Sequence, residues 1–262
     1  LQTMPNLKAI LSRGAGVDAI LRDETIPKQI PLSRVVDGDL TQRMTAYITL
    51  QVLMHHREQL RLLANQKAHI WDSFATSAPA ESRVGILGFG HLGQDAGKVL
   101  THLGFEVAGW SQTRKEVPGI VSYAGADELD PFLARTDILV VLLPHTAKTH
   151  GILNRALFRK LSRSGPLGAP VLINAGRGKL QVEADILAAL DAGELAACSL
   201  DVFETEPLTK DSPLWSHPRV IISPHQAADS DPVTISRYVL GEIRYFEDTG
   251  HLRTQVDRTR GY

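Results

Sequence analysis

Cysteine and long hydrophobic runs are almost absent from this sequence. The only cysteine, Cys198, has no partner for a disulfide within the chain and lies in the apolar run Ala196–Leu200. We therefore expect an inert, buried thiol and not a nucleophile. No apolar run approaches the length of a membrane span, and no signal peptide opens the chain. These absences predict a cytoplasmic protein that does not contact a membrane.

The sequence also lacks an excess of either charge. Its 262 residues include 28 Lys and Arg against 29 Asp and Glu, so no broad cationic field is available to bind nucleic acid. Any anion site must be local, and we expect no metal site. A methionine is also lacking at the first position, because the chain begins at Leu1. Its first residues look like the middle of a domain, so we expect upstream sequence to be missing.

Six apolar runs, rich in β-branched residues, predict strands. Several are apolar throughout, as is typical of parallel strands covered on both faces. Helical patterns at 92–103 and 182–190 separate some of them, and this alternation predicts a doubly wound α/β sheet. The expected strands are Arg83–Leu87, Glu106–Trp110, Asp137–Leu143, Pro170–Ala175, Ala197–Phe203 and Arg219–Ser223.

Two further helices are expected outside this alternation. Residues 232–248 carry apolar side chains on one helical face. Thr41–Trp71 is predicted to form one long helix whose apolar residues exceed a narrow stripe. It is interpreted as a packing arm between subunits, which predicts a homodimer; packing within one chain is the open alternative.

A glycine-rich loop lies between the first strand and its helix. The segment Gly88-Phe89-Gly90-His91-Leu92-Gly93 has the pattern Gly-x-Gly-x-x-Gly. Glycines at this spacing permit a tight turn and a close backbone approach to a pyrophosphate, which the helix amides then face. The loop predicts dinucleotide binding.

The end of the second strand bears on which dinucleotide is bound. Sites for NAD usually place Asp or Glu there, whereas this chain has Ser111-Gln112-Thr113-Arg114-Lys115. Hydroxyl groups and two cations without a neighbouring carboxylate favour a 2′-phosphate. The segment predicts NADP(H), with NAD(H) possible; an ordinary basic loop is the alternative.

Three more polar segments follow strands, at the edge where open α/β sheets bind ligands. They contain Arg177, Glu206 and His225. Arginine offers a fixed fork of donors to a carboxylate, and histidine can transfer a proton. A neighbouring carboxylate would favour the imidazolium and orient its ring. Each residue alone is typical of turns or structural contacts, but together they predict one site.

These segments resemble the D-2-hydroxyacid dehydrogenase family. The resemblance covers nearly the whole chain from Gly14–Asp18 onward. It is strongest at the glycine loop, 143–146, 174–178, 201–207 and 223–228. Within the family the chain is similar to NADP-dependent glyoxylate/hydroxypyruvate reductases, in its 110–115 segment and its ending, 255–262.

The resemblance implies reduction of a small 2-keto acid to the 2-hydroxy acid. Arg177 would bind the substrate, His225 would be the acid/base and Glu206 its partner. Asp201 would meet the nicotinamide carboxamide, and the amides of Ala15, Gly16 and Val17 would hold the substrate carboxylate. The other residues expected to bind the cofactor are Gly88, Gly90, His91, Leu92, Gly93, Ser111, Arg114, Lys115, Leu143, Pro144, Thr149, Ala175 and Ala227.

The implied organisation is a Rossmann cofactor domain, residues 47–228, with a smaller flavodoxin-like substrate domain, residues 1–46 and 229–262. That smaller domain is expected to lack its N-terminal part. Gln112 stands where many of these reductases carry a basic residue, which would weaken the grip on a 2′-phosphate. A nucleotide-binding regulatory or corepressor-like protein is the alternative function. Formate dehydrogenase is disfavoured because it usually has glutamine where this chain has Glu206.

Overall fold

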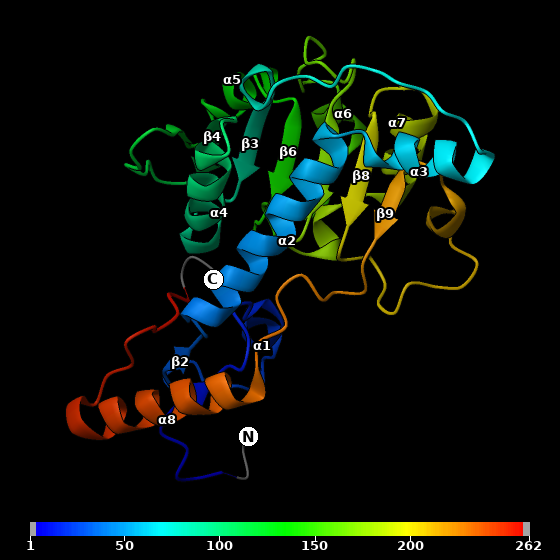
Figure 1. Ribbon diagram of the computed structural model, residues 1–262. Coiled ribbons are helices and arrows are strands. Elements are labelled where there is room, and N and C mark those ends of the chain that lie inside the picture. Colours follow the sequence, from blue (N-terminus) through cyan, green and yellow to red (C-terminus); the bar gives the residue numbers. More distant parts are fainter. Residues whose placement is uncertain (1–3, 259–262) are drawn as a thin grey trace. The chain divides into compact units, whose positions relative to one another are not determined.

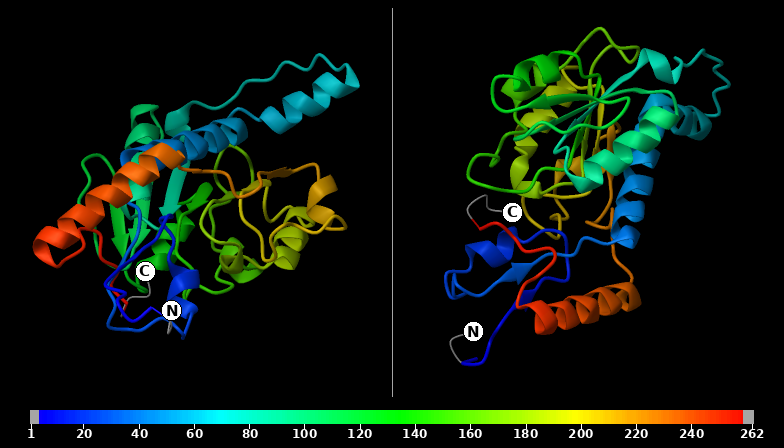
Figure 2. Two further views of the ribbon diagram at one scale, coloured as in Figure 1. Left: turned by 90° about the horizontal axis from the view of Figure 1, so that it is seen from below. Right: turned by 90° about the vertical axis from the view of Figure 1, so that its left-hand side faces the viewer.

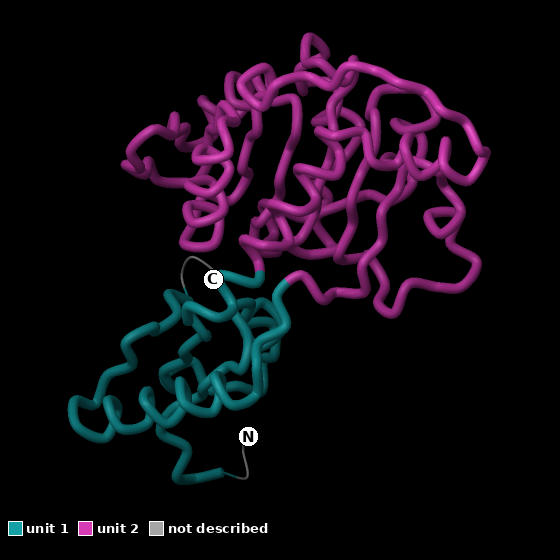
Figure 3. The backbone as a smooth tube through the Cα atoms, viewed as in Figure 1, with its two compact units in different colours: residues 1–43, 228–262 teal, residues 44–227 magenta. Residues whose placement is uncertain are grey.

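The computed structural model describes residues 4–258 and divides into two compact units (Figure 3). Unit 1 comprises Leu1–Arg43 and Ala228–Tyr262, and unit 2 comprises Met44–Ala227. The sequence predicts domain boundaries after residues 46 and 228. The chain passes from one unit to the other after residues 43 and 227. The similarity noted at residues 259–262 lies outside the described residues.

Unit 2 is built on a seven-stranded parallel sheet (Figure 1). Its spatial order is β5-β4-β3-β6-β7-β8-β9, so the order reverses between β3 and β6. This is the doubly wound arrangement with one strand added, and the Rossmann prediction is confirmed. The strands are β3 (Arg83–Leu87), β4 (Glu106–Ser111), β5 (Val121–Ala124), β6 (Ile138–Val141), β7 (Val171–Asn174), β8 (Ala197–Leu200) and β9 (Val220–Ile222).

Helices cover both faces of this sheet. Figures 1 and 2 show α4 and the unit 2 part of α2 on one face, with α5, α6 and α7 on the other. Among residues 4–258, no helix is both long and apolar enough to cross a membrane. The helices are α2 (Gly38–His56), α3 (Gln59–Ala68), α4 (His91–His102), α5 (Leu129–Ala134), α6 (Arg155–Phe158) and α7 (Glu183–Asp191), with short 3-10 helices η1 (Pro79–Glu81), η2 (Gly178–Leu180) and η3 (Pro213–Ser216).

The central strands are buried along their whole length. Every residue of β6, β7 and β8 is buried, which explains why their sequences are mainly apolar instead of alternating. The two polar exceptions, Asn174 and Ser199, are hydrogen-bonded. Cys198 lies in β8 with no exposed surface, and burial raises the pKa of its thiol, so it stays protonated at neutral pH.

The single long helix expected at Thr41–Trp71 is wrong. The structure has two helices, because Glu58 adopts a left-handed conformation, φ 50°, between α2 and α3. His69, with φ 57°, then ends α3, so the helix stops before Trp71, where the expected helix ended. Neither break carries glycine or proline, the usual signals of a helix end, so the sequence pattern did not indicate it.

Two smaller expectations also differ from the structure. The edge strand β5 was not predicted, since its four residues include only two with strong apolar character and none is buried. Val99 of α4 and Leu103, which follows the last residue of α4, are exposed although both belong to the helical pattern expected at 92–103. The buried residues are instead Gly93, Ala96, Gly97 and Leu100.

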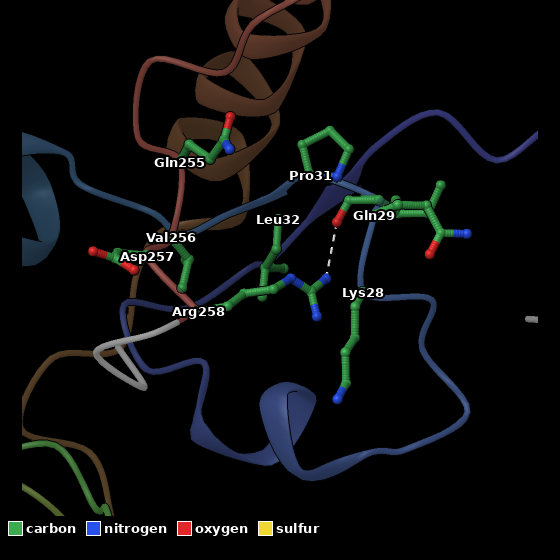
Figure 4. A pocket seen from close by; sticks show the side chains of 9 residues that line it. Lys28, Gln29, Pro31, Leu32, Gln255, Val256, Asp257 and Arg258 are labelled. Carbon is green, nitrogen blue, oxygen red and sulfur yellow. Dashed lines mark hydrogen bonds between the residues drawn. The ribbon is translucent and has the colours of Figure 1, made fainter.

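Unit 1 contains a two-stranded parallel sheet of β1 (Ile10–Leu11) and β2 (Leu32–Ser33), with α1 (Asp18–Arg22) and α8 (Pro232–Thr249). Its small core joins the two chain ends, since Val17, Leu32 and Val256 pack together. A cavity of about 450 Å³ lies beside β2 (Figure 4), and Arg258 donates to the carbonyl oxygen of Ile30 there at 2.8 Å.

Within unit 2, a buried polar network attaches α2 to β8. The Ser199 hydroxyl donates to Gln51 Oε1, and it lies 2.7 Å from Nε2 of His55. Because the hydroxyl has a single proton, His55 must donate to it, which fixes the tautomer of the imidazole. Burial lowers the pKa of His55 to about 4.

This network predicts a loss of stability in mild acid. The ordinary pKa of histidine is 6.5, so the unfolded chain takes up a proton below that pH while folded His55 stays neutral down to about pH 4. The free energy of unfolding should therefore fall as pH drops from 6.5 to 4, by up to about 3 kcal/mol from this residue. Urea midpoints at pH 7.5 and pH 4.5 should differ less in His55→Gln than in the wild type.

The exposed His102 provides the matched control. His102→Gln makes the same chemical change and should keep the wild-type pH dependence. If the urea midpoints at pH 7.5 and pH 4.5 differ equally in wild type and His55→Gln, the pH dependence of stability does not come from His55.

Candidate active site

The predicted site segments in unit 2 follow strands that run parallel, so their carboxyl ends share one edge of the sheet. The glycine loop follows β3, and Leu143 and Pro144 follow β6. Ala175 and Arg177 follow β7, Asp201 and Glu206 follow β8, and His225 and Ala227 follow β9.

The glycine loop has the geometry of a phosphate cradle. Gly88 has φ 108°, and a Cβ there would lie 2.7 Å from the backbone of Leu142, so only glycine fits. Gly90 precedes α4, and a Cβ on it would meet open space. Among the described residues no side chain caps this end of α4, whose first turn contains His91, Leu92 and Gly93. Its amides are therefore suited to an anion such as a pyrophosphate.

The segment expected to bind a 2′-phosphate begins at Ser111, the last residue of β4. Ser111 Oγ donates to the carbonyl oxygen of Thr113 at 2.8 Å, and Lys115 Nζ donates to Thr113 Oγ1 at 3.0 Å. The guanidinium of Arg114 donates to the Ser122 carbonyl oxygen and to the carboxylate of Glu128.

Glu128 was not anticipated from the sequence. It lies 14 residues after Arg114, at the start of α5, and its other oxygen accepts from the Ala124 amide at 2.6 Å. That backbone hydrogen bond and Arg114 lower the pKa of Glu128. The segment itself has no acid, as expected, but an ionised carboxylate from α5 contacts its arginine.

The loop that follows β6 is held by Thr149. The Thr149 hydroxyl donates to the Pro144 carbonyl oxygen at 2.8 Å and accepts from the Thr146 amide at 2.8 Å. Leu143 and Thr149 are both buried. These contacts hold the loop immediately after β6, beside the strand at which the sheet order reverses.

Arg177 lies in a loop that is packed tightly against the segment after β8. A Cβ on Gly178 would lie 1.7 Å from the carbonyl oxygen of Phe203, so the chain can pass only with glycine there. Gln181 bridges the same two segments, accepting from Asn174 Nδ2 at 2.8 Å and donating to the Val202 carbonyl oxygen at 2.9 Å. Arg177 itself donates to the carbonyl oxygen of Gly176 at 2.7 Å.

The structure brings His225 and Glu206 into direct contact. Nδ1 of His225 lies 2.7 Å from Oε2 of Glu206, and Oε1 of Glu206 accepts from the Phe203 amide at 2.9 Å. The carboxylate is thus anchored on one oxygen and pairs with the imidazole on the other. Half of the His225 side chain is exposed (51%), and with Nδ1 engaged, Nε2 is the nitrogen available to a substrate.

Asp201, which is almost fully buried, contacts residues on both sides of His225. Its carboxylate accepts from Ser223 Oγ at 2.6 Å and from the amides of Gln226 and Ala227, each at 3.0 Å. The backbone after β9, which carries His225, is therefore fixed to the end of β8. The contact predicted between Asp201 and a nicotinamide carboxamide stays a prediction.

Ala15, Gly16 and Val17 belong to unit 1 and precede α1. Within the part of the chain that the structure describes, no backbone hydrogen bond donated by Ala15 or Gly16 is found. Their amides are therefore available to an anion. Their role in holding a substrate carboxylate stays a prediction.

Fold and sequence together define the class of this protein. Residues 49–227 match the family described as D-isomer specific 2-hydroxyacid dehydrogenase, NAD binding domain. The chain belongs to this family, and the family resemblance found in the sequence is confirmed.

Within this family, the chain is similar to proteins named glyoxylate/hydroxypyruvate reductase A. The chain is 43% identical to glyoxylate/hydroxypyruvate reductase A of Salmonella paratyphi B, over 98% of this chain and 82% of that protein. Identity to the protein of the same name from Yersinia enterocolitica is 38%, over 100% and 84%.

Solved structures agree with these relatives. The structure is similar to NADPH-dependent glyoxylate/hydroxypyruvate reductase from Sinorhizobium meliloti, solved with NADP and sulfate, with TM-score 0.96 and 48% identity over 98% of this chain and 81% of that one. A probable 2-hydroxyacid dehydrogenase from Rhizobium etli, solved with NADP, HEPES and L(+)-tartaric acid, has the same TM-score and identity, over 100% and 82%.

Proposed function

We propose that this protein reduces a small 2-keto acid of the glyoxylate or hydroxypyruvate type with NADPH, giving the 2-hydroxy acid. The observation that carries the proposal is the His225–Glu206 pair, which lies on the same sheet edge as the glycine cradle. An exposed imidazole oriented by a carboxylate is the arrangement that general acid catalysis needs. The reductases to which the chain is similar support the choice of substrate and cofactor.

Each residue then has a distinct task. NADPH, when bound, supplies a hydride to the carbonyl carbon. Arg177 binds the carboxylate of the keto acid with its fork of donors. His225 gives its proton to the carbonyl oxygen as that oxygen becomes an alkoxide. Glu206 orients the ring through its contact with Nδ1.

The proposal is tested by product formation. Purified protein mixed with NADPH and glyoxylate should consume NADPH and form glycolate in equal amounts. A nucleotide-binding regulatory protein would bind NADPH and form no product. That second result would refute the proposal even if the dinucleotide bound tightly.

Cofactor preference gives a prediction of its own. Arg114→Ala removes a charge-assisted contact to the 2′-phosphate worth roughly 1.5–3 kcal/mol, so the KM for NADPH should rise about 10- to 100-fold. The KM for NADH should barely change, because NADH has no such phosphate. Steady-state kinetics with both cofactors give the comparison, and an equal effect on the two would refute the assignment of Arg114.

The neighbouring Glu128 supplies a second variant for this test. Glu128→Gln keeps an oxygen that can accept from the Ala124 amide but removes the charge beside Arg114. The KM for NADPH should not rise in Glu128→Gln as it does in Arg114→Ala, because the negative charge that is removed lies near the 2′-phosphate and would repel it. NADH again serves as the internal reference.

We further propose that the protein is a homodimer. Large apolar side chains are exposed on α2, on α3 and just after it, with Trp71 98% exposed. Exposed apolar patches of this kind mark association surfaces. The residues are Leu50, Leu62, Leu63, Ile70 and Trp71. Light scattering at micromolar concentration should give the mass of two chains, and a monomer would reject the proposal.

A further inference from the structure

A chain of hydrogen bonds in unit 2 links α2 to the loop that carries His225. The hydroxyl of Tyr47 lies 2.8 Å from Ser223 Oγ, and Ser223 Oγ lies 2.6 Å from Asp201 Oδ1. Tyr47 is separated from Ser223 by 176 residues in the sequence. None of the chemistry assigned above uses Tyr47 or Ser223.

The direction of these bonds follows from proton counting. The Ser223 hydroxyl donates to Asp201 Oδ1, so its one proton is already used. Tyr47 must then donate to Ser223 Oγ. Burial raises the pKa of Tyr47 to about 12, so the phenol keeps its proton and remains a donor throughout the neutral range.

Asp201 connects this chain of hydrogen bonds to the backbone at His225. Its carboxylate accepts from the amides of Gln226 and Ala227, and its carbonyl oxygen accepts from the His225 amide at 2.8 Å. His225 has φ 53°, in the left-handed region that residues with a side chain rarely adopt. Such a conformation persists only where surrounding contacts over-determine it, and the contacts to Asp201 are among those that do so.

We propose that Tyr47 and Ser223 are positioning residues for the reduction, acting through Asp201 on the backbone that carries His225. This inference rests on the proposed function, because His225 is taken as the proton donor. Tyr47 supplies the first donor in this chain of hydrogen bonds. When the Tyr47 hydroxyl is removed, Ser223 Oγ no longer accepts the hydrogen bond that orients it. Asp201 then holds the His225 loop less firmly, while the cradle that binds the dinucleotide is untouched.

The test uses Tyr47→Phe, which keeps the ring and removes only the hydroxyl. Its matched control is Thr45→Val on the same helix. The Thr45 hydroxyl donates to Asp95 Oδ2 of α4 at 2.6 Å, and that bond does not lead to Asp201. Both variants lose one hydrogen bond from α2, so both should be destabilised to a similar extent in thermal melts.

Two readouts separate positioning from mere stability. The kcat of Tyr47→Phe should fall about fivefold or more, the effect of one net hydrogen bond, with the Kd for NADPH within about twofold of the wild type. Thr45→Val should keep the wild-type kcat. Independently of turnover, the His225 ring signals in NMR spectra, assigned with His225→Ala, should shift in Tyr47→Phe and not in Thr45→Val.

Ser223 supplies a rescue. Ser223→Ala should reproduce the loss of kcat and the shift of the His225 signals, and Ser223→Thr, which keeps a hydroxyl, should restore both in part. An inactive wild type would refute the proposed function, and the NMR comparison would still decide this inference. Unchanged His225 signals and unchanged kcat in Tyr47→Phe, or equal changes in Thr45→Val, would overturn it.

Discussion

His225→Ala is expected to lower kcat for keto-acid reduction by about 100- to 10,000-fold, the usual contribution of a positioned general acid. The Kd for NADPH should stay near the wild-type value, because the cradle after β3 is unaffected. Stopped assays for product and a direct binding titration measure the two quantities. Full turnover without the imidazole would remove His225 from the mechanism.

Glu206→Gln tests the other half of the pair. Glutamine keeps an oxygen for the Phe203 amide but removes the negative charge beside Nδ1 of His225. Because a neutral amide replaces the charged partner that orients the ring, kcat for keto-acid reduction should fall about fivefold or more, with the Kd for NADPH near the wild-type value.

The matched control is Glu204→Gln, two residues away. The Glu204 carboxylate accepts from the Glu183 amide at 2.7 Å and is not the partner of His225. Its kcat should match that of the wild type. If the kcat of Glu206→Gln also stays at the wild-type value, Glu206 does not position His225.

Arg177→Lys is expected to have the second largest effect. Lysine keeps the charge but not the planar fork that holds a carboxylate by two bonds, so kcat/KM for the keto acid should fall about 10- to 100-fold. The same exchange at Arg159, which pairs with Glu194 on the surface at 3.1 Å, should leave kcat/KM unchanged. A wild-type kcat/KM in Arg177→Lys would exclude bidentate binding by this residue.

The central part of the fold could be predicted because its signals are local. β6, β7 and β8 are buried on both faces, so their sequences are mainly apolar without alternation, and the glycine loop occurs at its expected place between β3 and α4. Where no local signal exists, prediction failed. Glu58 breaks the long helix without glycine or proline, and β5 is a short, poorly buried edge strand.

The candidate site shows the same division. Arg177, Glu206 and His225 could be selected as candidates because each follows a strand of a parallel sheet, whose ends lie along one edge, and the structure brings Glu206 into contact with His225. The contacts of Arg114 with Glu128 and of Tyr47 with Ser223 could not, because they depend on how distant segments pack. No spacing rule joins residues that are 176 positions apart.

The most direct test of the account is a comparison of kcat/KM for glyoxylate, hydroxypyruvate and phenylpyruvate, each with NADPH and with NADH. We expect NADPH with one of the two small keto acids to give the highest kcat/KM. Phenylpyruvate as the best substrate would contradict the assigned substrate class, and a preference for NADH would contradict the assigned cofactor. Binding of NADPH without reduction of any of the three acids would contradict the claim that this site is a keto-acid reductase.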